Sequence, residues 1–456
     1  MKLSIKEIIN VTHGECINKV ENIVEVSDIT TDSRSEVETG LFIPLRGEKF
    51  DAHNFIEAVF DKGNVVTLTS EDVVRDSRLY TIKVKDTSKA LLDIAKCYRN
   101  KFDIPVIGIT GSVGKTSTKE MISAVLSGKL NVHKTAGNFN NEVGLPLTLL
   151  KLEDKHEVAV IEMGMNHFDE IHRLSLTALP KISVITNIGT SHIENLGSRE
   201  GILKAKLEIT DGMDENGILI INGDNDLLSR EINIPIKKIT YGLSSENQYY
   251  TKNIDFKGEV TVATVVSPLK EYDIEINSPG EHMVYNTLAA IAVAEELGLS
   301  KQEVLNGLKE YTPVKMRMHI ETYENGITVI DDTYNASPDS MEAALKVLKG
   351  YDAKGRKIAV LGDMLEMGEF GPKLHEEVGK YASDIGIDIL YAIGDIAKYI
   401  YIGAKNENKI DTVYYSTKEM FVNKLEECIL PGDVILFKAS RGMRFEEMLA
   451  TIRKVK

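Results

Sequence analysis

The sequence lacks the features of membrane and secreted proteins, of general nucleic-acid binders and of cysteine-based metal sites. No run of apolar residues in its 456 positions is long enough to span a bilayer, and residues 1–6 lead into no long apolar stretch, so neither a membrane span nor a secretory leader is predicted. The net charge of −15 argues against the basic surface that a general nucleic-acid binder needs. The cysteines Cys16, Cys97 and Cys428 form no metal-spaced pair and are expected to be reduced structural thiols. We expect a cytosolic protein that inserts into no membrane, and we expect it to be a monomer.

Apolar strand patterns alternate with amphipathic helix patterns along most of the chain, which is typical of α/β domains with parallel sheets. The length allows about three domains. We predict a small α/β domain at residues 1–86, a central parallel-sheet domain at 87–313 and a Rossmann-like domain at 314–456. The strands expected in the second and third domains lie at 104–109, 158–161, 182–186, 218–222, 327–330, 358–361, 389–393 and 434–437. We also expect a helical stretch near 53–60, a sheet segment at 272–279 and a helix that starts at Ser337-Pro338.

Residues 108–118, GITGSVGKTST, combine an apolar strand, a glycine-rich turn and the start of a helix. Backbone N–H groups of such a turn bind phosphate oxygens, Lys115 reaches the outer phosphates and the Thr116 hydroxyl ligates Mg²⁺. The strict pattern has a glycine where this chain has Ile109, so the match is to a variant, and a purely structural turn is the alternative. The segment predicts a nucleotide phosphate site.

Polar residues follow two of the predicted strands. Glu162 ends the apolar run 158–162, and His192 follows the strand at 182–186. Ligands of open α/β sheets lie at the carboxyl ends of strands, so one interpretation places both residues beside the phosphates as ligands of Mg²⁺. The other interpretation is a solvated glutamate and a polar histidine in ordinary packing.

Taken together, these segments resemble the Mur ligases, the ATP-dependent amide-forming family of peptidoglycan synthesis. The resemblance covers nearly the whole chain, and the family's own form of the P-loop accounts for the missing first glycine. The matching segments are 110–116, 135–146, 162–167, 186–192, 205–209, 280–282 with Asn286, and Arg317 with Met318. The resemblance implies three α/β domains: a small N-terminal UDP-binding domain, a central P-loop-type ATPase domain and a C-terminal Rossmann-like domain.

Within the family, residues 331–341 and 361–368 with His375 resemble the member that joins D-alanyl-D-alanine to UDP-N-acetylmuramoyl-tripeptide. Residues 31–34 and 51–55 resemble its UDP-sugar domain, although Ala52 stands where glycine is expected. The resemblance implies ATP and Mg²⁺ as cofactors, those two molecules as substrates and an acyl-phosphate intermediate. A different Mur-type or folylpolyglutamate synthase-like ligase and a non-catalytic nucleotide-binding scaffold are the alternatives, and the third residue of the tripeptide stays open.

The resemblance also implies which residues act. Thr116 and Glu162 ligate one metal ion, and His192 and Lys206 ligate a second. Lysine as a cation cannot bind Mg²⁺, so Lys206 either carries a carbamate, which offers oxygen ligands, or pairs with a substrate anion. Together with Lys115, residues Glu162, His192 and Lys206 form the implied catalytic group.

The remaining implied residues bind ATP or the UDP-peptide, and Arg317 and Asp332 reach the nucleotide when the third domain closes on the second. The ATP-binding set is Gly111, Ser112, Val113, Gly114, Lys115, Thr116, Ser117, Asn286, Arg317, Asp332, Tyr334 and Asn335; the substrate-binding set is Ser33, Arg34, Asn138 and Asn141. Lys438, Ser440, Arg441 and Arg444 either anchor a substrate carboxylate or phosphate or form the solvated start of a basic helix.

Overall fold

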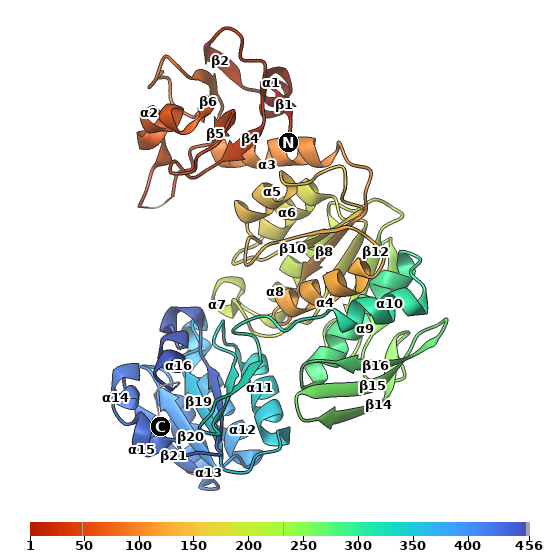
Figure 1. The fold of residues 1–456 in the computed structure, drawn as a ribbon, viewed down its shortest axis with the longest axis vertical. Coiled ribbons are helices and arrows are strands. Elements are labelled where there is room, and N and C mark those ends of the chain that lie inside the picture. Colours follow the sequence, from red (N-terminus) through yellow and green to blue (C-terminus); the bar gives the residue numbers. More distant parts are fainter. Residues whose placement is uncertain (48, 231, 453–456) are drawn as a thin grey trace. The chain divides into compact units, whose positions relative to one another are not determined.

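The fold is known from a computed structural model that describes residues 1–47, 49–230 and 232–452 (Figure 1). The chain forms two compact units. Unit 1 comprises Met1–Ile109, Leu130–Ser183 and Leu207–Gly217, and unit 2 comprises Thr110–Lys129, Val184–Lys206 and the chain from Ile218 onward. No helix among the described residues is both long enough and apolar enough to cross a bilayer.

A five-stranded sheet of order β2-β7-β6-β5-β4 opens unit 1. Strands β4 to β7 pair in parallel and β2 pairs antiparallel with β7. The helix expected near 53–60 is split into the short turns η1, α2 and η2. The elements are β1 (Leu3–Ser4), α1 (Ile5–Thr12), β2 (Glu15–Asn18), β3 (Glu25–Val26), β4 (Asp28–Thr30), β5 (Gly40–Phe42), η1 (Ala52–Phe55), α2 (Ile56–Val59), η2 (Phe60–Lys62), β6 (Asn64–Thr69), β7 (Tyr80–Lys83) and α3 (Thr87–Arg99).

A six-stranded sheet has the order β13-β12-β11-β8-β10-β9. Strands β8, β10 and β11 are buried along their whole length, which explains why they read as continuous apolar runs in the sequence. The elements are β8 (Val106–Thr110), α4 (Lys115–Ser127), β9 (Val132–Lys134), α5 (Gly144–Leu149), β10 (Val158–Glu162), α6 (Glu170–Ala178), β11 (Ile182–Ile185), α7 (Ile193–Leu196), α8 (Arg199–Leu207), η3 (Glu208–Thr210), β12 (Ile218–Asn222) and β13 (Lys237–Tyr241). All four strands predicted for the central region are confirmed.

A three-stranded antiparallel sheet, β14-β15-β16, follows in unit 2. The sequence predicted only its last strand. Ser300 begins α10 with a capping box: its hydroxyl accepts the N–H of Glu303, and the Glu303 carboxylate accepts the N–H of Ser300. The elements are β14 (Tyr250–Lys257), β15 (Val260–Val266), β16 (Glu271–Ile276), α9 (Glu281–Glu296) and α10 (Lys301–Lys309).

The last sheet has the order β17-β18-β22-β19-β20-β21, and every pair except β17 with β18 is parallel. One face packs on α11, α12 and α13, and the other packs on α14, α15 and α16 (Figure 1). Helix α11 starts at Ser337-Pro338, as predicted. The elements are β17 (His319–Thr322), β18 (Thr328–Asp331), α11 (Pro338–Gly350), β19 (Lys357–Gly362), η4 (Gly368–Phe370), α12 (Gly371–Asp384), β20 (Ile389–Ile393), α13 (Lys398–Glu407), β21 (Asp411–Tyr415), α14 (Lys418–Val422), α15 (Leu425–Cys428), β22 (Val434–Lys438), η5 (Arg441–Met443) and α16 (Glu446–Ile452).

Candidate active site

The glycine-rich turn between β8 and α4 has a backbone that requires glycine at two positions. Gly111 has a φ of 150°, and a Cβ there would lie 1.8 Å from the Thr186 hydroxyl oxygen. Gly114 has a φ of 86° and immediately precedes helix α4. The first N–H groups of a helix have no partner within the helix, and they favour an anion at this end. The turn therefore has the geometry of a phosphate site.

The segment after β11 fixes the shape of this turn. The N–H of Ser112 donates to the Asn187 carbonyl at 3.1 Å, and the N–H of Val113 donates to Asn187 Oδ1 at 2.8 Å. The Thr186 hydroxyl donates to the Val113 carbonyl at 2.5 Å, and the Gly189 N–H donates to Ser112 Oγ at 3.0 Å. These bonds join residues 112–113 to residues 186–189, which lie far apart in the sequence. Ser112 and Val113 therefore have a structural role in the turn.

Two lysines bring positive charge to this region. Lys115 Nζ donates to the Gly111 carbonyl at 2.8 Å, across the glycine-rich turn. Lys206, on α8, is only 1% exposed. Burial, together with the nearby charge of Lys115, lowers the pKa of Lys206 well below the ordinary value of a lysine. The environment therefore favours the neutral amine of Lys206.

Asn286 and Thr118 connect helices α9 and α4. The Thr118 hydroxyl donates to Asn286 Oδ1 at 2.8 Å, and Asn286 is 6% exposed. The predicted nucleotide residue Asn286 is thus held next to the helix that begins at Lys115.

Residues of the last 150 positions reach the same region of unit 2. Arg317 Nη2 donates to the Thr116 hydroxyl at 3.2 Å, and its guanidinium lies 4.0 Å from the centre of the Tyr334 ring. The Met318 N–H donates to Asp332 Oδ1 at 3.2 Å. The structure therefore brings the predicted residues Arg317, Asp332 and Tyr334 together, and Asn335 is exposed in the same loop.

The end of the chain corrects one interpretation. Lys438 and Ser440 are 2% and 3% exposed, so neither belongs to a solvated start of a basic helix. Lys438 Nζ donates to Asp332 Oδ2 and, at 2.9 Å, to the Asn335 carbonyl. Arg441 and Arg444 are exposed, and they pair with Glu446 and Glu447 respectively.

His192 has a left-handed backbone, with a φ of 64°, at the start of α7. Its Nδ1 lies 2.8 Å from Glu366 Oε2, and this contact lowers the pKa of Glu366. Glu366 also has a positive φ, of 63°. The sequence analysis included Glu366 in the segment 361–368 but gave it no contact with His192, because only the fold brings these two segments together.

Glu162 lies in unit 1 and is 1% exposed, which excludes the interpretation of a solvated glutamate at a strand end. Its Oε1 accepts the Asn140 side-chain N–H at 2.8 Å, and its backbone N–H donates to Thr135 Oγ1 at 3.0 Å. Of the neighbouring asparagines, Asn138 is exposed, and Asn141 Oδ1 accepts the N–H of Gly144, the first residue of α5, at 2.9 Å. The sequence analysis missed Asn140.

The predicted UDP residues also belong to unit 1. Arg34 pairs with Asp32 through two side-chain bonds of 2.9 and 2.8 Å, and these bonds lower the pKa of Asp32 to about 2. The Arg34 side chain is 87% exposed. Ser33 is partly buried in the same turn, at the carboxyl end of β4.

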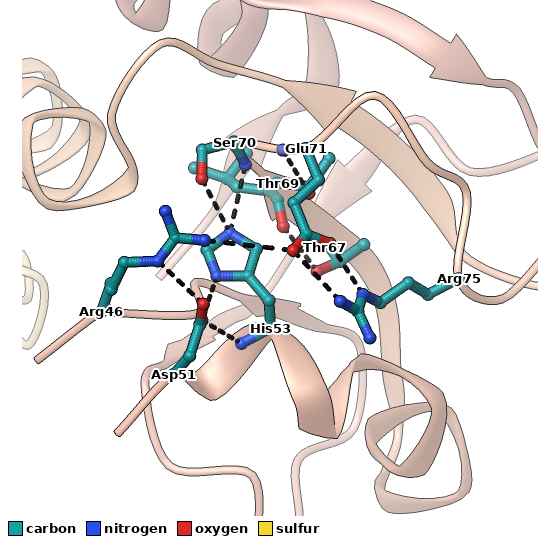
Figure 2. A network of polar contacts seen from close by, with 9 residues as sticks. Arg46, Asp51, His53, Thr67, Thr69, Ser70, Glu71 and Arg75 are labelled. Carbon is teal, nitrogen blue, oxygen red and sulfur yellow. Dashed lines mark hydrogen bonds and ion pairs between the residues drawn. The ribbon is translucent and has the colours of Figure 1, made fainter. Parts of the chain in front are cut away.

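A second polar network lies at the carboxyl ends of β5 and β6 (Figure 2). The buried His53 contacts Asp51 Oδ1 through Nδ1 at 2.6 Å, and its Nε2 accepts the Ser70 N–H at 3.1 Å, so Nδ1 carries the proton. Arg46 donates to Asp51 Oδ2 at 2.8 Å. Ala52 is buried at the start of η1, where its backbone does not require the expected glycine.

The donor set suits Mg²⁺ held together with nucleotide phosphates. The described residues contain no group of three or more His, Cys, Asp or Glu side chains that could hold a metal ion. Mg²⁺ is usually bound through one or two carboxylates plus substrate phosphates, so no all-protein cage is expected. The buried Glu162 carboxylate and the Thr116 hydroxyl have the oxygen chemistry that the ion prefers.

The fold and this site define an α/β nucleotide-binding enzyme whose last domain contributes to the phosphate region. Residues 109–294 match the Mur ligase middle domain, and residues 316–441 match the Mur ligase, glutamate ligase domain. The chain belongs to the Mur ligase family.

Similar proteins cover the chain from end to end. A UDP-N-acetylmuramoyl-tripeptide–D-alanyl-D-alanine ligase of Bacillus subtilis is 40% identical over 98% of both chains, and that of Escherichia coli is 34% identical over 94% of both. The crystal structure of MurF from Acinetobacter baumannii superposes with a TM-score of 0.93, at 30% identity over 100% of this chain and 99% of that one. MurF from Thermotoga maritima, solved with ADP, has a TM-score of 0.85 at 28% identity over 94% and 97%. The expected family and three-domain α/β fold are confirmed.

Proposed function

We infer that the protein joins D-alanyl-D-alanine to UDP-N-acetylmuramoyl-tripeptide with hydrolysis of ATP to ADP and phosphate, in peptidoglycan synthesis. The observation that carries this inference is the end-to-end similarity, at 40% identity, to a relative named for that activity. The phosphate site at residues 111–118 and the cluster of Arg317, Asp332 and Tyr334 supply the residues that such a reaction needs.

The reaction needs positive charge because one anion attacks another. An oxygen of the tripeptide carboxylate bonds to the γ-phosphorus of ATP as the bond to ADP breaks. The dipeptide's amine, having lost a proton, then bonds to the acyl carbon, and the C–O bond to phosphate breaks. Lys115 and Arg317 stabilise the charge of the transferring phosphoryl group, and Asn286 and Asp332 hold the nucleotide, with Tyr334 and Asn335 supporting that contact.

Mg²⁺ fits the available donors. As the family resemblance implies, Thr116 and Glu162 would hold one ion, and His192 with Lys206 would hold a second. When bound, the ions would offset the charge of the phosphate oxygens. Glu366 contacts Nδ1 of His192 at 2.8 Å, so Nε2 is the nitrogen that would meet an ion, and the carboxylate would orient the ring.

Lys206 acts as a carbamate in this proposal. Only a neutral amine adds CO₂, with loss of a proton, and burial together with the charge of Lys115 favours the neutral form. A carbamate offers oxygen atoms, which Mg²⁺ prefers. The alternative is an ammonium that pairs with a substrate anion, whose charge would oppose the lowering of the pKa by burial.

The N-terminal domain binds the UDP portion of the substrate through Ser33 and Arg34, and Asn138 and Asn141 contribute to the peptide site. We divide the chain at 86/87 and 313/314: α3 begins at Thr87, just after the Asp86 carboxylate that caps it, and the two matched family domains are separated at 295–315. We also propose that the enzyme is cytoplasmic and that it is a monomer.

One assay tests the function. Purified protein with Mg²⁺, ATP and D-alanyl-D-alanine is supplied with a UDP-tripeptide ending in lysine or in diaminopimelate, and ADP and product mass are measured. We expect the pentapeptide to form with one of the two and ADP release to depend on both substrates. ATP turnover without a peptide product, or product formation from a different amine only, would refute the assignment.

A further inference from the structure

Lys438 is a buried cation that no step of the reaction above uses. It ends strand β22, and its side chain is 3% exposed. Its ammonium donates to Asp332 Oδ2 and to the carbonyl of Asn335. A lysine is almost never fully buried unless its charge is paired, so these two acceptors account for its position.

The two acceptors lie at the two ends of one short loop. This loop, residues 332–335, follows β18, which is the parallel neighbour of β22. The backbone supports the junction, since the N–H of Asp332 donates to the carbonyl of Phe437 at 3.0 Å. Lys438 therefore binds the beginning and the end of the loop at once, and it fixes the orientation of the Asp332 carboxylate.

The loop carries the side chains that meet the nucleotide in the proposed function. In the sequence, Tyr334 lies between Asp332 and Asn335, the two acceptors of Lys438. The guanidinium of Arg317 stacks on the Tyr334 ring. Arg317 in turn donates to the hydroxyl of Thr116, the second residue of α4. A chain of contacts thus joins Lys438 to the phosphate site through residues of three separate segments.

A further group faces this ion pair from another helix. His282, in the first turn of α9, lies close enough to Asp332 and Lys438 for both charges to act on its pKa, and its own burial lowers that pKa to about 4. His282 is therefore neutral at physiological pH and does not replace Lys438 as the cation beside Asp332. The lysine is the charge that holds this carboxylate in place.

We propose that Lys438 is a positioning residue for ATP: it holds Asp332 and the 332–335 loop in the conformation that binds the nucleotide, without touching substrate itself. This inference rests on the proposed function, since it takes Asp332 as a nucleotide contact. Partners that orient a ligand-binding side chain change affinity by about tenfold when removed.

The test compares Lys438→Met with a matched control, Arg356→Met. Arg356 forms a similar ion pair with the buried Asp433 at the opposite, amino ends of β19 and β22 in the same sheet. The dissociation constant of ATP is measured by calorimetry, which needs no turnover, together with KM for the UDP-tripeptide and the melting temperature. We expect Lys438→Met to weaken ATP binding about tenfold with KM for the UDP-tripeptide unchanged, and Arg356→Met to lower only the melting temperature.

A double variant separates positioning from general damage. In the Asp332→Asn background, adding Lys438→Met should change ATP affinity less than twofold, because the carboxylate that the lysine orients is gone. An unchanged ATP affinity in Lys438→Met, or the same loss in both backgrounds, would overturn the proposal. If Lys438→Met does not fold, Lys438→Gln, which also removes the charge, takes its place, and an unchanged affinity overturns the proposal equally. Failure of the wild-type protein to bind ATP would instead refute the proposed function.

Discussion

The phosphate region of unit 2 and the Asp32-Ser33-Arg34 turn of unit 1 hold their basic side chains in opposite ways. Lys206 is 1% exposed and its pKa is lowered, whereas the Arg34 side chain is 87% exposed and pairs with Asp32. A buried basic group acts on chemistry, because low local polarity changes its protonation state and strengthens the field of the charges beside it. An exposed arginine binds a substrate group by exchanging one anionic partner for another. Substitutions in the first region should therefore change turnover, and those in the second should change substrate affinity.

The largest effect is expected at Lys115. Lys115→Ala removes a charge that is needed more in the phosphoryl transfer step than in bound ATP, so turnover at saturating ATP should fall by about a hundredfold or more. The matched control is Lys129→Ala, a partly exposed lysine just beyond the end of the same helix that pairs with Glu303. Steady-state kinetics of ADP release measures both, and turnover of Lys115→Ala within a few-fold of wild type would contradict this role.

Lys206→Ala should also lose about a hundredfold in turnover, and small carboxylates should restore part of it. The substitution removes the oxygen donors of the carbamate, and millimolar acetate or formate fills the gap with a carboxylate. Lys115→Ala should show no such recovery. Lys204→Ala, an exposed lysine on the same helix, is the matched control and should keep wild-type turnover. Mass spectrometry under gentle conditions checks the added CO₂, and near-normal turnover of Lys206→Ala would remove the carbamate from the proposal.

The sequence predicts the buried strands of the fold well, but it does not predict contacts between side chains that are far apart in the chain. Strands β8, β10 and β11 were predicted because strands buried on both faces are continuous apolar runs. The hairpin of β14 and β15 was missed, since β15 is buried on one face only and β14 is mostly exposed. The burial of Lys438 was missed because a sequence shows a charge and not its depth. The contacts of Asn140 and Glu366 were missed for a related reason, since their partners, Glu162 and His192, lie on other elements.

The exposed turn should govern affinity for one substrate only. Ser33→Ala with Arg34→Ala should raise KM for the UDP-tripeptide about tenfold and leave KM for ATP nearly unchanged. The chain contains its own control in Asp76-Ser77-Arg78, which has the same three residues as the Asp32 turn and the same Asp–Arg hydrogen bonds. This second turn comes before the amino end of β7, whereas the Asp32 turn follows the carboxyl end of a strand. Ser77→Ala with Arg78→Ala should therefore leave both KM values unchanged. Equal effects of the Ser33 and Arg34 substitutions on both substrates would show that the two regions are not separate in function.

The smallest effect concerns the pH dependence of stability in the buried region. Burial lowers the pKa of His282 from 6.5 to about 4, so between these values the unfolded chain binds a proton that the folded protein does not. The stability that the neutral His282 contributes is complete above pH 6.5 and is lost as the pH falls toward 4. The free energy of unfolding should fall by up to about 3 kcal/mol over this range, which corresponds to several degrees in melting temperature. His282→Asn should flatten this decline, whereas His13→Asn, at an exposed histidine whose left-handed backbone asparagine tolerates, should not. Calorimetric melting at several pH values measures the slope. If the melting temperature fell equally with pH in wild type and in His282→Asn, the acid sensitivity of this region would arise from other groups. Burial would then not disfavour the protonated form of His282.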